Sequence, residues 1–192
     1  MKTYIIPTIS TKKSVSLIRE AKKKGLDVSC SVAIHNLIFT DELLKDFDTN
    51  AKVLPPLRTK EDIKALIKGL KDGTIDMLTS DHSPMDTEHK KVEFDNALYG
   101  TIGLESAFGA LNNIFSTEEV VEMLSKGKQR FGVEDIEIKE GNPADLSLFI
   151  PDEHYEFTEN HIFSTSKNSI FKGYQLKGKA LGIITKAGNF GL

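Results

Sequence analysis

The first part of the chain alternates short apolar runs with a stretch of helical periodicity. An apolar run over residues 3–10 precedes residues 11–25, in which apolar side chains recur at helical spacing; Val28, Cys30 and Val32 then recur at every second position. Spacings of three to four and of two place side chains on one face of a helix and of a strand, respectively. The pattern therefore predicts a strand, a crossover helix and a second strand, which form a βαβ unit.

The clearest helical pattern covers residues 59–73. Thr59 and Asp62 have the spacing of an N-terminal capping box, and Gly73 is a typical helix stop. The apolar stripe of this helix consists of Ile63, Leu66, Ile67 and Leu70. Residues 74–81 then have the length and composition of a strand with polar residues at its carboxyl end. Alternating strands and helices predict an α/β fold with a parallel sheet.

The remaining sequence changes character near residue 133. Residues 86–103 lack a sustained period and predict a long loop, and residues 104–115 and 116–132 predict helices, the second with a capping box. Beyond them, short strands separated by Gly, Asn and Pro are predicted at 135–150, 155–158, 161–164 and 178–188. The sequence thus predicts two domains, residues 1–132 and a β-rich segment of residues 133–192.

The composition limits the binding partners and the cellular compartments that we expect for this chain. The 192 residues carry a net charge of -3, so no global basic field favours nucleic acid or an anionic membrane surface. No segment approaches the roughly 18 apolar residues of a membrane span, and the first apolar run is too short for the core of a signal peptide. The single cysteine, Cys30, excludes an internal disulfide and fits a reducing compartment. We therefore expect a cytoplasmic protein with a buried thiol.

Asp81 is the first candidate for chemistry. It follows the predicted strand 74–81 at the carboxyl end, where parallel α/β sheets collect ligands and catalytic groups. A carboxylate there can ligate a divalent metal or accept a proton from metal-bound water. An aspartate after a strand is also a common turn or helix-capping residue, so the position alone does not distinguish these roles.

Several short motifs give that aspartate a context. PPLR at 55–58, TSDH at 79–82 and GLE at 103–105 follow one another, with IST at 9–11 before them and GNPADLSLF at 141–149 after them. In this order the chain resembles the dihydroorotase branch of the amidohydrolase superfamily. The resemblance implies the last three strands of a (β/α)8 TIM-like barrel, followed by strands of a small β-sandwich domain.

The resemblance also implies a reaction and site residues. Dihydroorotases interconvert carbamoyl-aspartate and dihydroorotate, a cyclic amide of pyrimidine biosynthesis, at a zinc centre. By position in the motifs, Asp81 would be a metal ligand and the general acid/base. Arg58 would lie at the mouth of the site, and Tyr99 and Gly100 would contact the substrate.

Three positions depart from the family pattern. Where the resemblance implies a metal-binding histidine the chain has Thr8, whose hydroxyl is a poor zinc ligand. Leu54 replaces a substrate-binding asparagine and Met85 a substrate-binding histidine, so two polar contacts are lost. The family's H-x-H motif is also absent from these residues. We therefore expect no zinc at Asp81 from this chain alone.

The remaining histidines do not replace the missing ligands. His35 matches a family histidine that is not a metal ligand, and a hydrogen-bonded structural role is expected for it. His82 is adjacent to Asp81, and neighbouring strand residues point to opposite faces, so the two are not expected to share a metal. A new site made from His82, His89 and Asp86 would need a rigid loop to hold it, which the sequence does not predict.

Three functional hypotheses follow. The chain belongs to a cyclic amidohydrolase whose amino-terminal half supplies the missing ligands, or to a non-catalytic dihydroorotase-like protein that is a structural or regulatory partner of a pyrimidine-pathway enzyme, or it is an unrelated α/β binding domain. Truncation alone would not explain Thr8, Leu54 and Met85, which favour a degenerate site. Three barrel strands also leave an unpaired sheet edge, so we expect a homo-oligomer or a requirement for the amino-terminal half.

Overall fold

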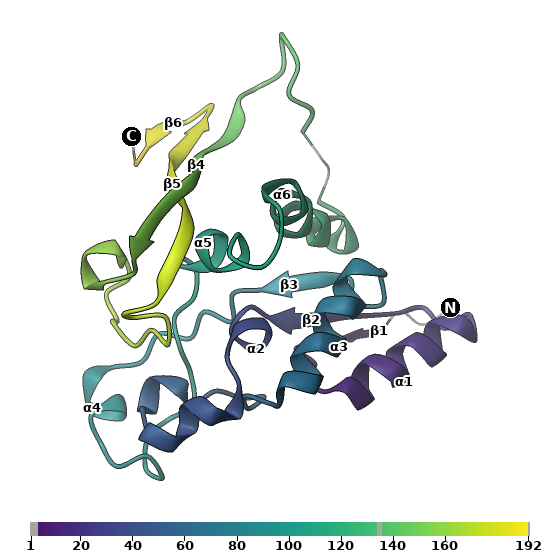
Figure 1. The fold of residues 1–192 in the computed structure, drawn as a ribbon. Helices are drawn as coiled ribbons and strands as arrows, with labels where there is room; N and C mark the ends of the chain where they lie inside the picture. Colours follow the sequence, from purple (N-terminus) through teal and green to yellow (C-terminus); the bar gives the residue numbers. More distant parts are fainter. Residues whose placement is uncertain (1–3, 134–135, 192) are drawn as a thin grey trace.

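A computed structural model describes residues 4–133 and 136–191 and contains two sheets (Figure 1). The first is parallel, in the order β1 (Tyr4–Ile6), β2 (Val28–Ala33), β3 (Met77–Thr79). The second is antiparallel, in the order β4 (Asp145–Glu156), β5 (Gln175–Thr185), β6 (Gly188–Phe190). A segment with a parallel sheet is thus followed by a β-rich segment, in the order that the sequence predicts.

Three longer helices accompany the parallel sheet. Helix α1 (Lys12–Lys23) packs against β2 and against α3 (Lys60–Lys71), and α6 (Thr117–Lys126) packs against β3. Figure 1 shows α1 and α3 side by side, with α6 beside β3. Both predicted capping boxes are confirmed, at the first turns of α3 and α6. Each box satisfies backbone N–H groups that a helix cannot pair internally.

Shorter helical segments connect these elements. They are the α-helical turns α2 (His35–Ile38), α4 (Thr87–Lys90) and α5 (Ala107–Leu111), and the 3-10 turns η1 (Asp41–Asp46), η2 (Thr49–Ala51), η3 (Gly127–Phe131) and η4 (Glu159–His161). The loop predicted for residues 86–103 therefore includes one helical turn.

Two predicted elements differ from the structure because tertiary contacts override the local pattern. The helix predicted at 104–115 is reduced to α5, and just before it the N–H groups of Gly103 and Leu104 donate to His82 Nδ1, each over 3.3 Å. The strand predicted at 161–164 is absent, because His161 Nδ1 accepts from Thr158 N over 3.1 Å and closes η4.

The other β-strand boundaries also move. The segment predicted at 135–150 becomes a strand only from Asp145, with residues 134 and 135 outside the described part, and residues 155–156 continue β4 rather than start a new strand.

One apolar core includes residues from both parts of the chain. Val15, Cys30 and Leu66 from the parallel-sheet region belong to the same buried cluster as Phe157 and Phe171 from the C-terminal region. Cys30 is fully buried, as expected, and burial is the main cause that raises its pKa to about 11. The C-terminal segment therefore contributes to the hydrophobic stabilisation of the parallel-sheet region.

The first strand is poorly covered. Tyr4, Ile5 and Ile6 are 57%, 41% and 40% exposed, so both faces of β1 reach solvent. This strand is also at the edge of its sheet, where backbone groups have no neighbouring strand.

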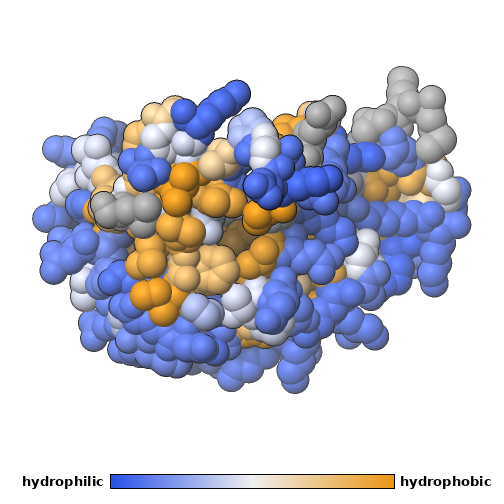
Figure 2. Space-filling view, turned by 90° about the horizontal axis from the view of Figure 1, so that it is seen from above, coloured by the Kyte–Doolittle hydropathy of each residue, from blue (hydrophilic) through white to orange (hydrophobic). Residues whose placement is uncertain are grey.

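A second uncovered apolar region lies elsewhere. Figure 2 shows apolar side chains gathered around a hollow on the face where Figure 1 places β4, β5, β6 and α6. Exposed apolar residues on these elements include Val121, Leu124, Ile150, Leu181 and Ile183.

The shared core predicts a contrast between two phenylalanines. Phe157 is 1% exposed and Phe163 is 92% exposed. Phe157→Ala should lower the free energy of unfolding by about 3–5 kcal/mol, because it removes a buried ring and leaves a cavity. Phe163→Ala, the matched control, should change it by less than about 0.5 kcal/mol. Denaturant unfolding of the two variants measures the difference, and equal losses would contradict this core.

Candidate functional site

The carboxyl ends of the three parallel strands meet at one edge of the sheet. Thr8 follows β1, His35 follows β2, and Asp81 follows β3. Hydrogen bonds extend the pairing past the strand ends: Thr8 N donates to Ser31 Oγ over 2.9 Å, and Ile34 N donates to Thr79 O over 3.0 Å. These bonds hold together the ends of strands that are distant in the sequence.

Asp81 lies two residues beyond β3 in a left-handed backbone conformation. Its φ of 48° is uncommon for a residue other than glycine, although aspartate tolerates this region better than most. Its N–H donates to Thr79 Oγ1 over 3.0 Å, which fixes the turn. Burial raises the pKa of its half-buried carboxyl group, because desolvation disfavours the charged form.

His35 is a titratable neighbour of Asp81. Its Nε2 lies 3.9 Å from Asp81 Oδ2, which is too far for a hydrogen bond. The ring is fully buried, and neither ring nitrogen has a hydrogen-bond partner among the described residues. The sequence predicted a hydrogen-bonded structural histidine, so the burial agrees but the hydrogen bond is missing.

The charge states argue against an ion pair between these two groups. Burial lowers the pKa of His35 to about 4, and burial raises that of Asp81. An ion pair would shift both pKa values in the opposite directions. We therefore read the contact as a neutral imidazole facing a carboxyl group.

Arg58 reaches the same edge from the segment before α3. Its Nε donates to Ser10 Oγ over 3.3 Å, and Ser10 is buried just beyond β1. The Arg58 backbone is fixed as well, because Asp41 N donates to Arg58 O over 3.0 Å. The guanidinium group thus lies near the end of β1.

Tyr99 and Gly100 lie on the loop between α4 and α5. Gly100 N donates to Lys52 O over 2.9 Å, and Lys52 Nζ lies 5.1 Å from the centroid of the half-exposed Tyr99 ring. A Cβ atom on Gly100 would come within 2.9 Å of Ser83 Cβ, and its φ is 139°. The loop therefore passes close to the segment that follows Asp81.

His82 belongs to a different set of contacts from Asp81. Its Nδ1 accepts hydrogen bonds from the backbone N–H groups of Gly103 and Leu104. Its Nε2 lies 3.4 Å from Ser164 Oγ. Ser164 in turn donates from its N–H and its hydroxyl to Glu105 Oε1. Neither Ser164 nor Glu105 was expected from the sequence as a partner of His82, and the GLE motif was the only signal for Glu105. These contacts join the end of β3 to the C-terminal segment.

The residues at the edge do not fit a zinc centre by themselves. Structural and catalytic zinc sites use three or four nitrogen, sulfur or oxygen ligands from the protein. Asp81 and His35 are the acidic and imidazole groups brought together here, and Thr8 adds only a hydroxyl. Within residues 4–133 and 136–191, no group of three or more His, Cys, Asp or Glu side chains could hold a metal ion.

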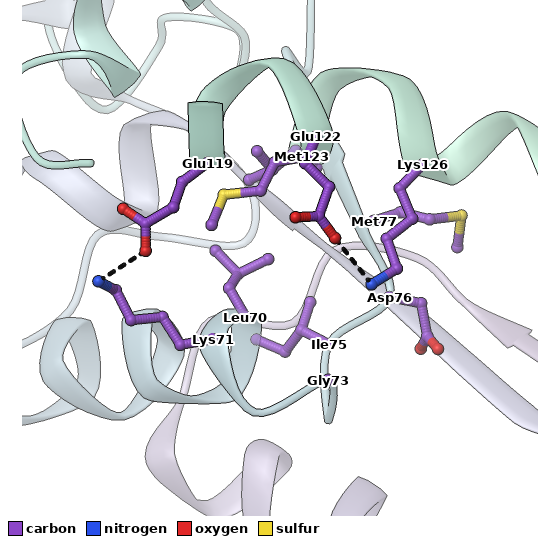
Figure 3. A pocket seen from close by; sticks show the side chains of 11 residues that line it. Leu70, Lys71, Gly73, Ile75, Asp76, Met77, Glu119, Glu122, Met123 and Lys126 are labelled. Atoms are coloured by element: carbon purple, nitrogen blue, oxygen red, sulfur yellow. Dashed lines mark hydrogen bonds and ion pairs between the residues drawn. The ribbon is translucent and has the colours of Figure 1, made fainter. Parts of the chain in front are cut away.

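A pocket elsewhere does not contribute to this site. It has a volume of about 190 Å³ and lies between α3, β3 and α6, with an apolar lining of Leu70, Ile75, Met77 and Met123 (Figure 3). Lys71 pairs with Glu119 over 3.0 Å and Lys126 with Glu122 over 3.5 Å at its rim. The pocket includes Asp76, before β3, and lies at the strand's amino end. Asp81 follows the opposite end.

Solved structures define the class of fold. An L-hydantoinase (dihydropyrimidinase) from Arthrobacter aurescens aligns with 96% of this chain and 44% of its own, with a TM-score of 0.85 and 27% identity. An inactive dihydroorotase-like domain of a Chaetomium thermophilum CAD-like multifunctional protein aligns with 98% and 51%, with a TM-score of 0.68 and 22% identity. The three parallel strands are therefore part of an amidohydrolase TIM barrel.

Curated sequences narrow the class further. A dihydroorotase from Thermoanaerobacter sp. (strain X514) is 44% identical over 179 residues, and one from Desulforapulum autotrophicum is 39% identical over 181 residues. The chain is thus similar to part of the curated dihydroorotases, as its motifs indicated. It spans about 42% of the length of these two relatives. No family model matches the chain.

The close approach at Gly100 predicts an effect on stability. Gly100→Ala should lower the free energy of unfolding by at least about 2 kcal/mol, because it combines a strained φ with a steric overlap. Gly73→Ala is the matched control: its φ is 74°, but no atom lies within 4 Å of the added Cβ. It should cost about 1 kcal/mol from the left-handed conformation alone. Thermal unfolding that ranks the two variants in the reverse order would contradict this loop geometry.

Burial of His35 predicts a pH dependence. Its pKa is about 4 in the folded protein and 6.5 without perturbation, so the unfolded chain binds more protons between these values. The stability linked to this group is present above pH 6.5 and is lost as the pH falls to 4, by about 3 kcal/mol at most. Unfolding of the protein and of His35→Gln across this range measures it. Parallel curves for the two proteins would show that the ring is not buried as described.

Proposed function

We propose that this chain forms one side of a cyclic-amide site in a dihydroorotase-like protein of pyrimidine biosynthesis. Its curated relatives are named dihydroorotase, and Asp81, the position that the family uses for metal binding and acid/base chemistry, lies at the carboxyl end of β3. The raised pKa of this half-buried carboxyl group suits a residue that exchanges protons. The ligand would be a small cyclic amide.

The other proposed contacts lie on segments near the strand ends and near the residues that follow Asp81. The Arg58 guanidinium can bind a substrate carboxylate through paired N–H donors, beyond the Nε that already donates to Ser10. Gly100 brings backbone close to the segment after β3, and Tyr99 offers a half-exposed ring next to it. These roles rest on position in the motifs and on proximity.

We propose further that the chain alone does not catalyse the interconversion of carbamoyl-aspartate and dihydroorotate. The single observation that carries this proposal is the donor set at the strand ends, where Thr8 follows β1 with a hydroxyl in place of an imidazole. Enzymes of the family use zinc. For this chain, the remaining zinc ligands would have to come from protein outside it.

A second candidate function is a non-catalytic, structural or regulatory partner of a pyrimidine-pathway enzyme. Leu54 and Met85 favour it, because neither side chain can make the polar substrate contacts that the family pattern has there. Leu54 is 64% exposed, so it does not compensate by filling the core.

Two features of the chain support proposals about its partners and its cellular compartment. The exposed β1 edge supports association, either with a second copy or with the amino-terminal half of a barrel. A reducing, cytoplasmic location is proposed from the single cysteine. Among the described residues, no helix is both long and apolar enough to cross a bilayer.

Metal content and turnover of the purified chain test the proposal. We expect neither dihydroorotase activity in either direction nor stoichiometric zinc, because the edge supplies too few ligands. About one zinc per chain together with turnover would overturn the proposal.

A gain of metal binding tests the role assigned to Thr8. Thr8→His adds an imidazole after β1, at the same sheet edge as Asp81, and histidine tolerates the left-handed φ of 41° at this position. Zinc affinity should rise by about tenfold or more. Thr165→His, on an exposed loop, is the control and should leave it unchanged. Equal affinities for both variants would show that position 8 does not face the site.

A further inference from the structure

A second cavity, of about 310 Å³, has four lysines among its ten lining residues. Lys90, Lys91, Lys167 and Lys172 border it, against a single carboxylate, Glu159. The chain as a whole carries a net charge of -3, whereas the lining of this cavity is positively charged. Clefts lined by charges of one sign raise the local concentration of the opposite ion.

Lys90 is the unusual member of this group. It is 7% exposed, and its Nζ donates to Thr49 O over 2.8 Å and to Leu98 O over 2.9 Å. A lysine ammonium has three protons, so two backbone oxygens leave one donor without an acceptor among the described residues. A buried lysine normally has a paired anion, and none of the described carboxylates forms an ion pair with this one.

The pKa of Lys90 reflects the burial of its ammonium group. Burial lowers it to about 8; Asp48 opposes this shift and Lys52 adds to it. An anion in the cavity would offset the cost of burying the ammonium group.

The other lysines of the cavity keep donors for a ligand. Lys167 Nζ donates to one acceptor, Ile162 O, over 2.7 Å. Glu159 already pairs with Lys172 over 3.2 Å, so it does not neutralise the remaining lysines. No described residue pairs with Lys91. The cavity therefore retains positive charge and unused N–H donors.

The wall of the cavity is continuous with the loop that carries Gly100. Asn168, another lining residue, donates from Nδ2 to Ser83 O over 3.0 Å and to Gly100 O over 3.3 Å. Its Oδ1 accepts from Met85 N over 3.2 Å. A ligand that orders this wall would also order the segment after Asp81.

We propose that this cavity binds a small phosphate-type dianion, either inorganic phosphate or the phosphate group of a small metabolite. Lysines bind phosphate as point charges, and the cavity offers several of them around a partly enclosed volume. A water molecule occupies about 30 Å³ of liquid, so a volume of about 310 Å³ accommodates a phosphate with a small organic group. Binding fixes the loop of residues 86–100. The cavity adjoins the proposed cyclic-amide site, because Met85 lines it and Asn168 donates to Gly100 O, but phosphate binding does not require turnover at that site.

Calorimetric titration of the whole chain with inorganic phosphate tests the site. Ionic strength is held constant with sodium chloride, so that non-specific screening does not change during the titration. We expect one phosphate per chain and slower amide hydrogen exchange over residues 86–100 when phosphate is bound. Absence of binding at millimolar phosphate, or binding without any change in exchange in that loop, would overturn the proposal.

Two matched double variants give the test its specificity. Lys91→Gln with Lys167→Gln removes two charges from the cavity and keeps an amide donor for Ile162 O. Lys64→Gln with Lys68→Gln removes two charges from exposed positions on α3. The cavity variant should bind phosphate at least about tenfold more weakly, and the α3 variant should bind as the unmodified protein does. Equal weakening in both would show a general charge effect and no site.

Discussion

The parallel pairing of β1, β2 and β3 is the constraint on which the candidate site depends. Tyr4 pairs with Val28 in one register, and Ser31 pairs with Met77 in the next, so all three strands run the same way. Their carboxyl ends therefore meet at one edge, and the residue that follows each strand determines the chemistry there. In this chain those residues are Thr8, His35 and Asp81, which place a hydroxyl, a neutral imidazole and a carboxyl group at this edge.

Hydrogen bonds from the C-terminal segment fix the backbone that follows this edge. Ile102 N donates to Asn168 O over 3.0 Å, and Ile170 N donates to Thr101 Oγ1 over 2.8 Å, so the segment after the Gly100 loop is tied to residues 168–170. Phe157 and Phe171 share a core with the sheet helices. A change in the lysine-lined cavity therefore has a short path, through Asn168, to the segment that follows Asp81.

Local signals in the sequence predicted the elements that local interactions determine. The capping residues of α3 and α6 and the apolar stripe of α3 placed these helices, and strand-length apolar runs placed the parallel sheet. The motif order placed Asp81 and Arg58 near the strand ends, where the structure has them. Their assigned roles in catalysis and binding stay predictions.

Contacts between distant residues account for what the sequence did not predict. The backbone that leads into α5 is held by His82, which lies more than twenty residues earlier in the chain, and no periodicity encodes that contact. Lys90 has the appearance of a surface lysine in the sequence, yet carbonyl groups from η2 and from its own loop enclose it. His35 likewise lacks a hydrogen bond within the described part of the chain because of the residues that surround it in the folded chain, which the local sequence does not reveal.

Proton–proton distances at the strand ends test the central claim most directly. With the backbone and His35 resonances assigned, nuclear Overhauser effects should connect the backbone protons of Val32 and Leu78 in a parallel pattern. They should also connect the His35 ring to the β-protons of Asp81, because Nε2 lies 3.9 Å from Oδ2. An antiparallel pattern, or a His35 ring that shows contacts only to groups distant from Asp81, would contradict the account.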